Sequence, residues 1–382
     1  MTLTALMLGV GAIALLVLGL ALGLELFCFA AGVVLLVLVY CAVSVLWARK
    51  HVTAELEADH EETLRGETVR YTLRVAHGAI LPVGPMRALC VCGAQEETHL
   101  LYLRLRKGTR ETWTRTMAHV GAYPVAVREA TLTDCFGIFK THCNIAPAGR
   151  LLVLPRPFLI AKLTFAQSED AQTALKRATE DTTMPDDIRA WQPGDPMKRV
   201  HWKLTARKRE LLVRRYESPM PKDTLILTDC AAMPRQTIPG REAMLRDALC
   251  ETVVAVADMQ LQDGSPVRVP LYGERPTEFS AERAQSLLIL QELLAEQTFR
   301  TDESFTRVLS QELKRVRRSG AVVIISPRLD PALTDLALSF RRMGPNVRYY
   351  LVTYEAEQPG WLPYIRRMQE AGAEVCYVTP AS

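Results

Sequence analysis

The chain of 382 residues has a formal net charge of +4, and 49% of its residues are hydrophobic. Its mean hydropathy of +0.05 averages two unlike regions, because residues 1–48 carry a single charge, Glu25, while the remainder has an ordinary soluble composition. This argues against a single small domain, a wholly disordered chain and a polytopic transporter, and nine cysteines, an odd number, argue against a secreted disulfide scaffold.

The first region is one apolar stretch, residues 3–46, interrupted around Gly23-Leu24-Glu25. Because a bilayer requires about 20 apolar residues per helix, we expect two transmembrane helices, near residues 3–22 and 26–46, with Glu25 in the connection. Basic residues follow the second helix at Arg49 and Lys50, and none precedes the first helix or lies in the connection. The positive-inside bias therefore predicts a multi-pass protein whose soluble domains lie in the cytoplasm.

The next region, residues 52–160, carries the signals of β-strands. Apolar and polar side chains alternate in four segments, residues 68–75, 99–106, 111–117 and 123–132. Short strands at this spacing, with Gly and Pro between them, predict a small antiparallel β-sandwich-like domain. Its four cysteines could in principle bind zinc, but we interpret them as small buried side chains: Cys90, Cys92, Cys135 and Cys143.

Residues 161–217 are predicted to be a linker followed by a basic block, and residues 218–382 alternate between strands and helices. Continuous apolar strands are expected at residues 224–228, 267–271, 321–326, 347–353 and 374–379. Helices are expected at residues 241–262, 281–296, 304–318 and 333–343. This order predicts a parallel, doubly wound α/β sheet, in which ligands lie outside the carboxyl ends of the strands. Asp229 and Cys230, after the first strand, are therefore the first place to look for a site.

The basic block, residues 186–217, reads DDIRAWQPGDPMKRVHWKLTARKRELLVRRYE. Pro193-Gly194 predicts a turn, Asp195 can cap a helix that follows it, and the segment from Leu211 to Tyr216 is typical of a strand. Between Lys198 and Arg215 there are eight basic residues and one acid, so this segment carries +7 and the rest of the chain −3.

This block resembles the signature of the bacterial domain-of-unknown-function family fifty-eight. Its usual form is R-x-Y-x-x-G-D-x-x-R-x-I-x-W-x-x-x-A-R followed by L-x-V-x-x-x-E, and ten positions match: Arg189, Gly194, Asp195, Arg199, Trp202, Ala206, Arg207, Leu211, Val213 and Glu217. Trp191 replaces the usual Tyr, and His201 stands where Asp is common. Upstream, residues 134–139 are similar to the family's D-P-F-G-L-F and residues 153–157 to its V-x-P-x-P.

The resemblance implies a protein of the bacterial inner membrane with a β-rich domain and a von Willebrand factor A-like α/β domain. Members commonly occur beside MoxR-type AAA+ ATPases and transglutaminase-like membrane proteins, so these are the implied partners, together with the bilayer that holds the hairpin. The implied role is that of an adaptor or assembly factor in protein maturation or envelope-related assembly. No enzymatic activity or cofactor follows from the resemblance.

A metal site is expected to be absent. A working A-type domain carries D-x-S-x-S after its first strand, and its carboxylate and hydroxyl oxygens suit Mg²⁺. This chain has Asp229-Cys230-Ala231-Ala232-Met233, which lacks both hydroxyls, so Asp229 is a degenerate metal-site position. The chain also lacks a P-loop and the G-x-G-x-x-G, H-E-x-x-H and G-x-S-x-G motifs.

The basic block admits several interpretations. Its arginines could pair with Asp186, Asp195 or Glu217 while Trp202 packs between domains, or the block could dock an acidic partner, plausibly the ATPase. Attraction to anionic lipid is a third interpretation, and nucleic-acid binding is the one we least expect. Arginine suits bidentate contact with carboxylate or phosphate and does not choose between these interpretations.

Our primary hypothesis is a non-enzymatic, membrane-anchored adaptor for a MoxR-type ATPase. The signature residues Arg189, Trp191, Gly194, Asp195, Arg199, His201, Trp202, Arg207 and Glu217 are its partner-binding candidates. The alternative is a hydrolase or transferase that uses His201 with Asp195, whose side chains would have to converge in a pocket with perturbed pKa values. A third hypothesis is an envelope-assembly component that acts without an ATPase.

Overall fold

The structure is a computed structural model that describes residues 3–78, 81–104, 108–158, 187–190, 200–208, 210–215, 223–301, 303–316, 319–355 and 358–380. The chain divides into two compact units. The first, here called the β-unit, comprises residues 1–156 with residues 291–297; the second, the α/β unit, comprises residues 157–290 and 298–382. Each unit is described by itself.

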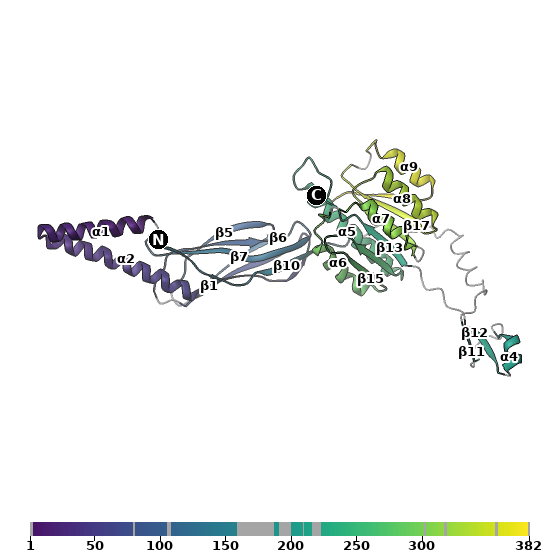
Figure 1. Ribbon diagram of the computed structural model, residues 1–382, viewed down its shortest axis with the longest axis horizontal. Coiled ribbons are helices and arrows are strands. Elements are labelled where there is room, and N and C mark those ends of the chain that lie inside the picture. The colour runs from purple at the N-terminus through teal and green to yellow at the C-terminus, as the bar shows by residue number, and fades with distance from the viewer. Residues whose placement is uncertain are drawn as a thin grey trace. The chain divides into compact units, whose positions relative to one another are not determined.

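The β-unit begins with two antiparallel helices, α1 (Leu3–Leu22) and α2 (Glu25–His51), which lie side by side (Figure 1). Both are long and apolar enough to cross a membrane, as judged by length and composition. Small residues on α1 recur every seven positions at Ala5, Ala12 and Gly19, and they are buried. At Gly19 a Cβ atom would lie 2.8 Å from the Sγ atom of Cys28, so the small residues allow the helices to approach closely.

The connection between the two helices is shorter than we predicted. Glu25 is the first residue of α2, and only Gly23 and Leu24 connect the helices, with Gly23 at a φ of 65°. The expectation that Glu25 lies in the connection is therefore wrong. A carboxylate in the first turn interacts favourably with the helix dipole, which explains why Glu25 belongs to α2.

Two β-sheets follow. The first has the order β6-β3-β1-β9, with bounds β1 Val52–Ala58, β3 Thr68–His77, β6 Thr109–Thr116 and β9 Asn144–Ile145. The second has the order β2-β10-β7-β4-β5, with bounds β2 Glu62–Leu64, β4 Met86–Cys92, β5 Gln95–Leu101, β7 Gly121–Thr133 and β10 Gly149–Leu154. The short strand β8 (Lys140–His142) pairs with β7.

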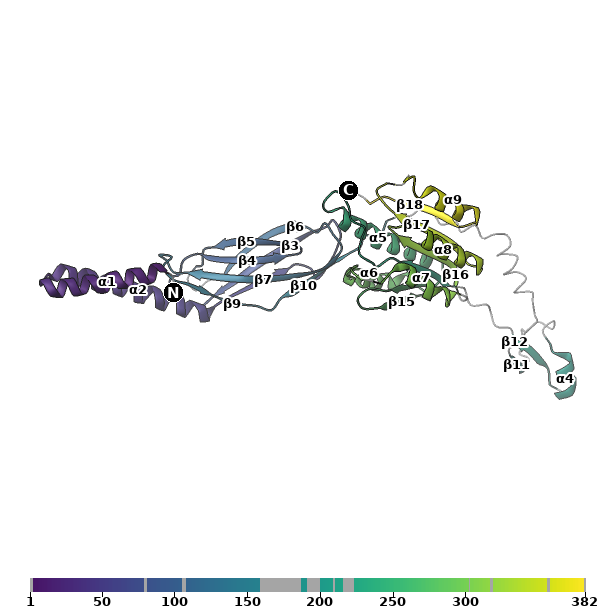
Figure 2. The ribbon, with the colours of Figure 1, turned by 45° about the horizontal axis from the view of Figure 1, so that its top comes forward.

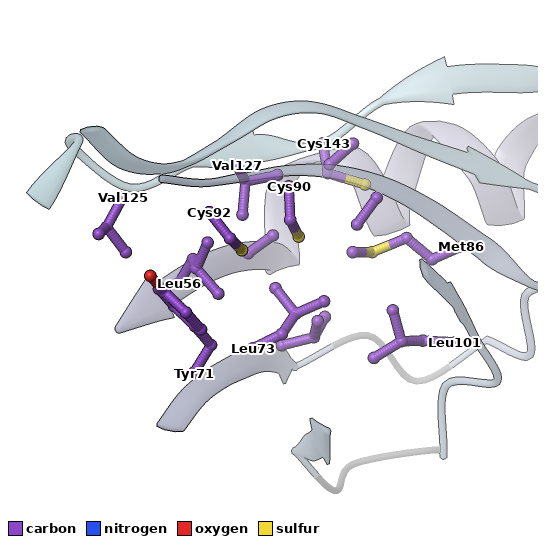
Figure 3. Close-up of a cluster of buried hydrophobic side chains, with 14 of the residues drawn as sticks. Leu56, Tyr71, Leu73, Met86, Cys90, Cys92, Leu101, Val125, Val127 and Cys143 are labelled. Atoms are coloured by element: carbon purple, nitrogen blue, oxygen red, sulfur yellow. The ribbon is translucent and has the colours of Figure 1, made fainter. Parts of the chain in front are cut away.

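Alternate residues of both sheets face one shared core (Figure 3). Tyr71 and Leu73 come from the first sheet, and Met86, Cys90 and Cys92 from β4 of the second; all are almost fully buried. Because side chains two residues apart on a strand lie on the same face, both cysteines point inward. Burial raises the pKa of the Cys90 thiol to about 12 and that of Cys92 to about 11, so both behave as small apolar side chains. Cys143 is also buried, but Cys135 is exposed, so its interpretation as a buried side chain is wrong.

Strand β5 begins earlier than the alternation predicts. The expected segment was residues 99–106, but β5 starts at Gln95, which pairs with Cys92 of β4 across a two-residue turn. Gly93 in this turn has a φ of 72°, a conformation that favours glycine. The hairpin therefore sets the start of the strand, and residues 105–107 lie outside the described residues.

The α/β unit contains a six-stranded sheet of order β15-β14-β13-β16-β17-β18 (Figure 2). The strand bounds are β13 Asp223–Thr228, β14 Val267–Leu271, β15 Thr277–Ala281, β16 Ser319–Ser326, β17 Asn346–Val352 and β18 Glu374–Val378. Neighbouring strands are parallel except for β15, which pairs antiparallel with β14. The expectation of an entirely parallel sheet is therefore wrong at this edge, where the hairpin from β14 to β15 reverses the chain.

Helices cover both faces of this sheet. The helix bounds are α5 Arg241–Gln262, α6 Leu287–Glu296, α7 Phe305–Leu313, α8 Pro331–Arg342 and α9 Leu362–Glu370, and the 3₁₀ turn η2 spans Ala284–Ser286. Side chains of α7, α8 and α9 share one core with alternate residues of the central strands, while α5 contacts β13, β14, β16 and β17. Ala295 of α6 packs with Leu152 and Leu154, and residues 291–297 belong to the β-unit.

A third, small group of elements lies in the basic block. Strand β11 (Asp187–Ala190) pairs antiparallel with β12 (Leu212–Arg215), and helix α4 (Trp202–Lys208) lies between them in the chain. The strand expected from Leu211 to Tyr216 corresponds to β12. The turn and helix start expected at Gly194 and Asp195 lie outside the described residues.

Candidate functional site

The order of the α/β sheet creates one position where neighbouring strands are reached by connections that leave in opposite directions. From β13 the chain passes through α5 to β14 on one side, and it later returns to β16 on the other side of β13. In open α/β sheets, ligands bind at such a switch point, outside the carboxyl ends of the strands. Asp229 directly follows β13 and Ser326 ends β16, so both lie at this point.

Asp229 is completely buried, and both of its carboxylate oxygens have partners. The backbone N–H of Ala231 donates to Oδ1 at 3.1 Å, and the hydroxyl of Ser326 donates to Oδ2 at 2.9 Å. The guanidinium of Arg328 contacts both oxygens, with Nη1 at 3.3 Å from Oδ1 and 3.0 Å from Oδ2. The carboxylate is therefore held by a strand and loop almost one hundred residues later in the chain.

The arginine is itself held in place from two sides. Its Nη2 atom donates to the carbonyl oxygen of Ala232, and its own backbone carbonyl accepts a 2.5 Å hydrogen bond from the hydroxyl of Tyr349. Its backbone N–H also donates to the hydroxyl of Ser326 at 3.1 Å. About a third of the Arg328 side chain, 32%, is still exposed. Arg328 thus covers the buried carboxylate at the switch point while part of its own side chain remains exposed.

Opposing effects act on the ionisation of Asp229. Burial raises the pKa of its carboxyl above the usual value, while Arg328, the Ala231 N–H and the Ser326 hydroxyl act in the opposite direction. The neighbouring Cys230 is also buried, and burial followed by the charge of Asp229 raises the pKa of its thiol to about 12. The thiol is therefore not poised to act as a nucleophile.

These residues do not fit the divalent cation that a working A-type domain holds. The positions of the two hydroxyl ligands are occupied by Ala231 and Met233, and the Asp229 oxygens already accept three donors. Hard cations require several oxygen ligands, whereas this site places the guanidinium of Arg328 beside the carboxylate. Among the described residues, no group of three or more His, Cys, Asp or Glu side chains could hold a metal ion.

Sequence reasoning identified Asp229 but missed Ser326, Arg328 and Tyr349. A signal was present, because Ser326-Pro327-Arg328 follows the strand Ala321–Ile325, whose continuous apolar character marks it as central. This signal points to Asp229 only if β16 is known to lie next to β13, and that depends on the order of strands in the sheet.

The partner-binding candidates of the basic block are placed only in part. Arg189 lies on β11 opposite Val213. The backbone N–H of His201 donates to the carbonyl oxygen of Leu212 at 2.8 Å, and its Nδ1 atom accepts from the N–H of Leu204 at 3.3 Å. His201 therefore closes the first turn of α4, in the manner of a helix cap.

Helix α4 presents an aromatic and basic surface. Trp202, its first residue, is 60% exposed, and Lys203, Arg207 and Lys208 are exposed as well. Thr205 connects the helix to β12, because its hydroxyl accepts from the N–H of Leu212 at 3.1 Å. Trp191, Gly194, Asp195, Arg199 and Glu217 lie outside the described residues, so their side chains are not brought together with these groups here.

Three of the solved structures that match this chain are weakly similar to it. The CARDB domain of a Pyrococcus furiosus protein, whose structure is described as a complex with di-metal ions, is 14% identical, with 27% of this chain and 91% of that chain covered and a TM-score of 0.22. A Niemann-Pick type C2 protein from the Japanese carpenter ant is 7% identical, with 27% and 92% covered and a TM-score of 0.17. The sporulation control protein Spo0M of Bacillus subtilis is 13% identical, with 37% and 58% covered and a TM-score of 0.17. Scores this low carry no argument about fold or function.

The family comparison is specific. A search of curated proteins found no match. Residues 187–359, however, match the family model described as "Protein of unknown function DUF58". This range begins at β11, includes the basic block and runs through β17 of the α/β sheet. It confirms the resemblance seen in the signature for this part of the chain, 173 of the 382 residues.

Proposed function

We propose that the chain is a membrane-anchored, non-enzymatic adaptor or assembly factor that docks a MoxR-type AAA+ ATPase through its basic block. The observation that carries the proposal is the exposure of Trp202 on α4, beside three exposed basic side chains. Exposed tryptophan and arginine are the side chains that most often dominate the energy of protein interfaces. A basic surface also attracts an acidic partner and speeds its association.

The α/β unit supports a binding role over a catalytic one. At the switch point, where an α/β enzyme would hold its ligand, the carboxylate of Asp229 is buried and paired with Arg328. The strand order, with one antiparallel edge strand, is compatible with a von Willebrand factor A-like domain, which we include in the proposal. The hydrolase or transferase alternative gains no specific support from the described residues, where His201 caps α4.

The proposal includes the predicted organisation of the chain. We take residues 1–48 as two transmembrane helices, residues 52–160 as a β-sandwich-like domain, residues 161–217 as linker and signature, and residues 218–382 as the A-like domain. Arg49 and Lys50 at the end of α2 favour soluble domains in the cytoplasm, at the inner membrane of a bacterium. Fusion of reporters active on one side of the membrane to residue 380 would test this orientation.

Docking is tested by co-purification from detergent-solubilised membranes. We expect a MoxR-type ATPase to be recovered with the parent chain and lost with Trp202→Ala or with Lys203→Glu combined with Arg207→Glu. The matched control is Arg366→Glu, which reverses an exposed charge on helix α9, outside the basic block in the sequence. Failure to recover any such ATPase, or equal loss with the control, would count against the proposal. Recovery of a transglutaminase-like membrane protein in the same eluate would add that protein to the proposed partners.

A further inference from the structure

The end of the β-unit that adjoins helix α2 has an unusual surface. Helix α2 runs into β1 without a linker, Ala48 of α2 belongs to the β-unit core, and the N–H of Gly78 donates to the carbonyl oxygen of His51 at 3.0 Å. Strand β8 and the ends of β3 and β7 contact the same helix. This end of the β-unit, here called the basal surface, is therefore held against α2.

One loop of the basal surface is shaped by a buried carboxylate. Asp134 is 1% exposed and accepts from the backbone N–H groups of Phe136 at 3.1 Å and Phe139 at 2.7 Å. Its own N–H donates to the carbonyl oxygen of Phe139 at 3.2 Å, so the loop is closed on itself. The closed loop leaves the Phe136 side chain 67% exposed.

The same loop reaches α2 at a definite depth. Cys41 of α2 lies close enough to Asp134 for the two side chains to interact. Gly19 of α1 packs against Cys28 of α2. Because the two helices are antiparallel and rise equally per residue, Leu3, sixteen residues before Gly19, lies level with Ser44, sixteen residues after Cys28. The 20 residues of α1 span about 30 Å, the thickness of the hydrocarbon core. Cys41 and the loop therefore lie about one helical turn inside the end of that span.

Large apolar side chains are exposed selectively at this end. In the described part of residues 52–156 four of them are exposed: Leu100, Tyr102, Phe136 and Ile145. Leu100 and Tyr102 flank Leu101, which pairs with Met86 at the start of β4, while Ile145 pairs with Ala54 near the end of α2. All four thus lie at the basal surface, where an exposed apolar cluster indicates a contact.

Basic side chains predominate around this cluster. Arg49, Lys50, Arg87 and Lys140 are exposed there. Within residues 131–145 Asp134 is the only acidic residue, and it is buried, while the exposed Glu129 lies 3.7 Å from His142 at the edge of the surface. A surface of apolar tips with basic side chains around them is complementary to an anionic membrane interface, because the apolar tips can enter it and the basic groups are attracted to its charge.

We propose that the basal surface is a second membrane contact, which inserts Phe136 at the interface of an anionic phospholipid bilayer and fixes the β-unit against the membrane. The inference rests on the proposed membrane anchoring by α1 and α2, but not on the ATPase. It assigns a task to the loop at residues 134–139: the buried Asp134 holds the loop closed, and the loop presents an aromatic side chain at the depth where aromatic residues favour the interface.

The test uses the full chain in vesicles of phosphatidylcholine and phosphatidylglycerol with brominated acyl chains, which quench tryptophan on contact. We expect Phe136→Trp to add emission that is blue-shifted and mostly lost in brominated vesicles. The matched control is Thr116→Trp, an exposed position at the opposite end of β6, whose partner Thr68 is nine residues from His77, or about 30 Å away. Emission added by Thr116→Trp should be unquenched. Equal quenching of the two, or none, overturns the inference.

Two further measurements separate the possible failures. If the parent chain is released from the vesicles by alkaline carbonate, the membrane anchor itself is refuted. If the chain stays bound and Phe136→Trp is still unquenched, only the basal contact is refuted, as would occur if the loop served a protein partner. Adding Lys140→Glu to Phe136→Trp should reduce the quenching in phosphatidylglycerol vesicles but not in pure phosphatidylcholine. An equal effect in both would overturn the preference for anionic lipid.

Discussion

Each unit of the protein buries an aspartate, and the two are stabilised in opposite ways. Asp134 in the β-unit accepts hydrogen bonds from backbone N–H groups two and five residues later in its own loop. Asp229 in the α/β unit depends on Ser326 and Arg328, which lie 97 and 99 residues later. The first carboxylate shapes a loop by local contacts, and the second joins two strands of a sheet. Their substitution should therefore have local and long-range consequences respectively.

The largest effect is expected from Arg328→Met. It leaves the completely buried Asp229 without its cation, and breaking a buried pair in this way typically costs about 3 kcal/mol or more. Burial already raises the pKa of Asp229, and loss of Arg328 raises it further. The variant should therefore lose stability as the pH rises through this raised pKa, and regain it below about pH 4, where the unfolded chain also binds the proton.

Hydrogen exchange of β13 and β16 should be measured below about pH 4 and at neutral pH. It reports the local stability of these strands without assuming one unfolding transition for the whole chain. The control is the double variant Asp229→Asn with Arg328→Met, which removes the buried charge together with its partner. It should recover much of the loss at neutral pH. A double variant as poorly protected as Arg328→Met alone would show that the charge of Asp229 is not the cause.

A smaller and more local effect is expected from Asp134→Ala. Two backbone N–H groups lose a charged acceptor, for which a cost of about 2 kcal/mol is typical. Exchange should accelerate in residues 134–140 while the paired strands β3 and β4 keep their protection. Asp59→Ala is a suitable control, since Asp59 accepts one backbone N–H, from Arg70, at an exposed position. Loss of protection throughout the β-unit would contradict the local interpretation of Asp134.

Tyr272→Phe should cost about 1 kcal/mol, the usual value of one hydrogen bond. The Tyr272 hydroxyl donates to the completely buried Glu312 at 2.7 Å, and burial together with this bond raises the pKa of the tyrosine to about 12. Arg268, at 3.1 Å, still neutralises Glu312 in the variant. Exchange of α7 should rise slightly with Tyr272→Phe and far more with Arg268→Met. If Tyr272→Phe and Arg268→Met accelerated the exchange of α7 equally, the ion pair with Arg268 would not be the main interaction that stabilises the buried carboxylate of Glu312.

The smallest effect on stability is expected from Phe136→Ser. The side chain is largely exposed and the loop is closed by Asp134, so the change should stay within about 0.5 kcal/mol. Thermal unfolding in detergent should match the parent, whereas association of the loop with anionic vesicles should be lost. A marked drop in the melting temperature would mean that Phe136 packs against protein.

Local pattern was a good guide to the elements of the α/β unit. Helix α5 begins and ends at the predicted residues, Arg241 and Gln262, and β14 spans the predicted residues 267–271. Long amphipathic helices and buried apolar strands carry strong periodic signals. Strand β15 and helix α9 were missed because each carries few apolar side chains. Only Phe279 and Ala281 are buried in Thr277–Ala281, and only Ile365 and Met368 in Leu362–Glu370.

By itself, the sequence determined the family resemblance of its C-terminal part, the two apolar helices, the change from β-strands to alternating strands and helices, and Asp229 as the first place to look for a site. These are local properties of composition, period and motif. Only the tertiary structure decided that Arg328 pairs with Asp229, that Asp134 closes a loop against α2, and that four exposed apolar side chains gather beside that helix. The reason is physical: a partner for a buried charge is fixed by which strands become neighbours, and neighbours in a sheet can be a hundred residues apart in the chain.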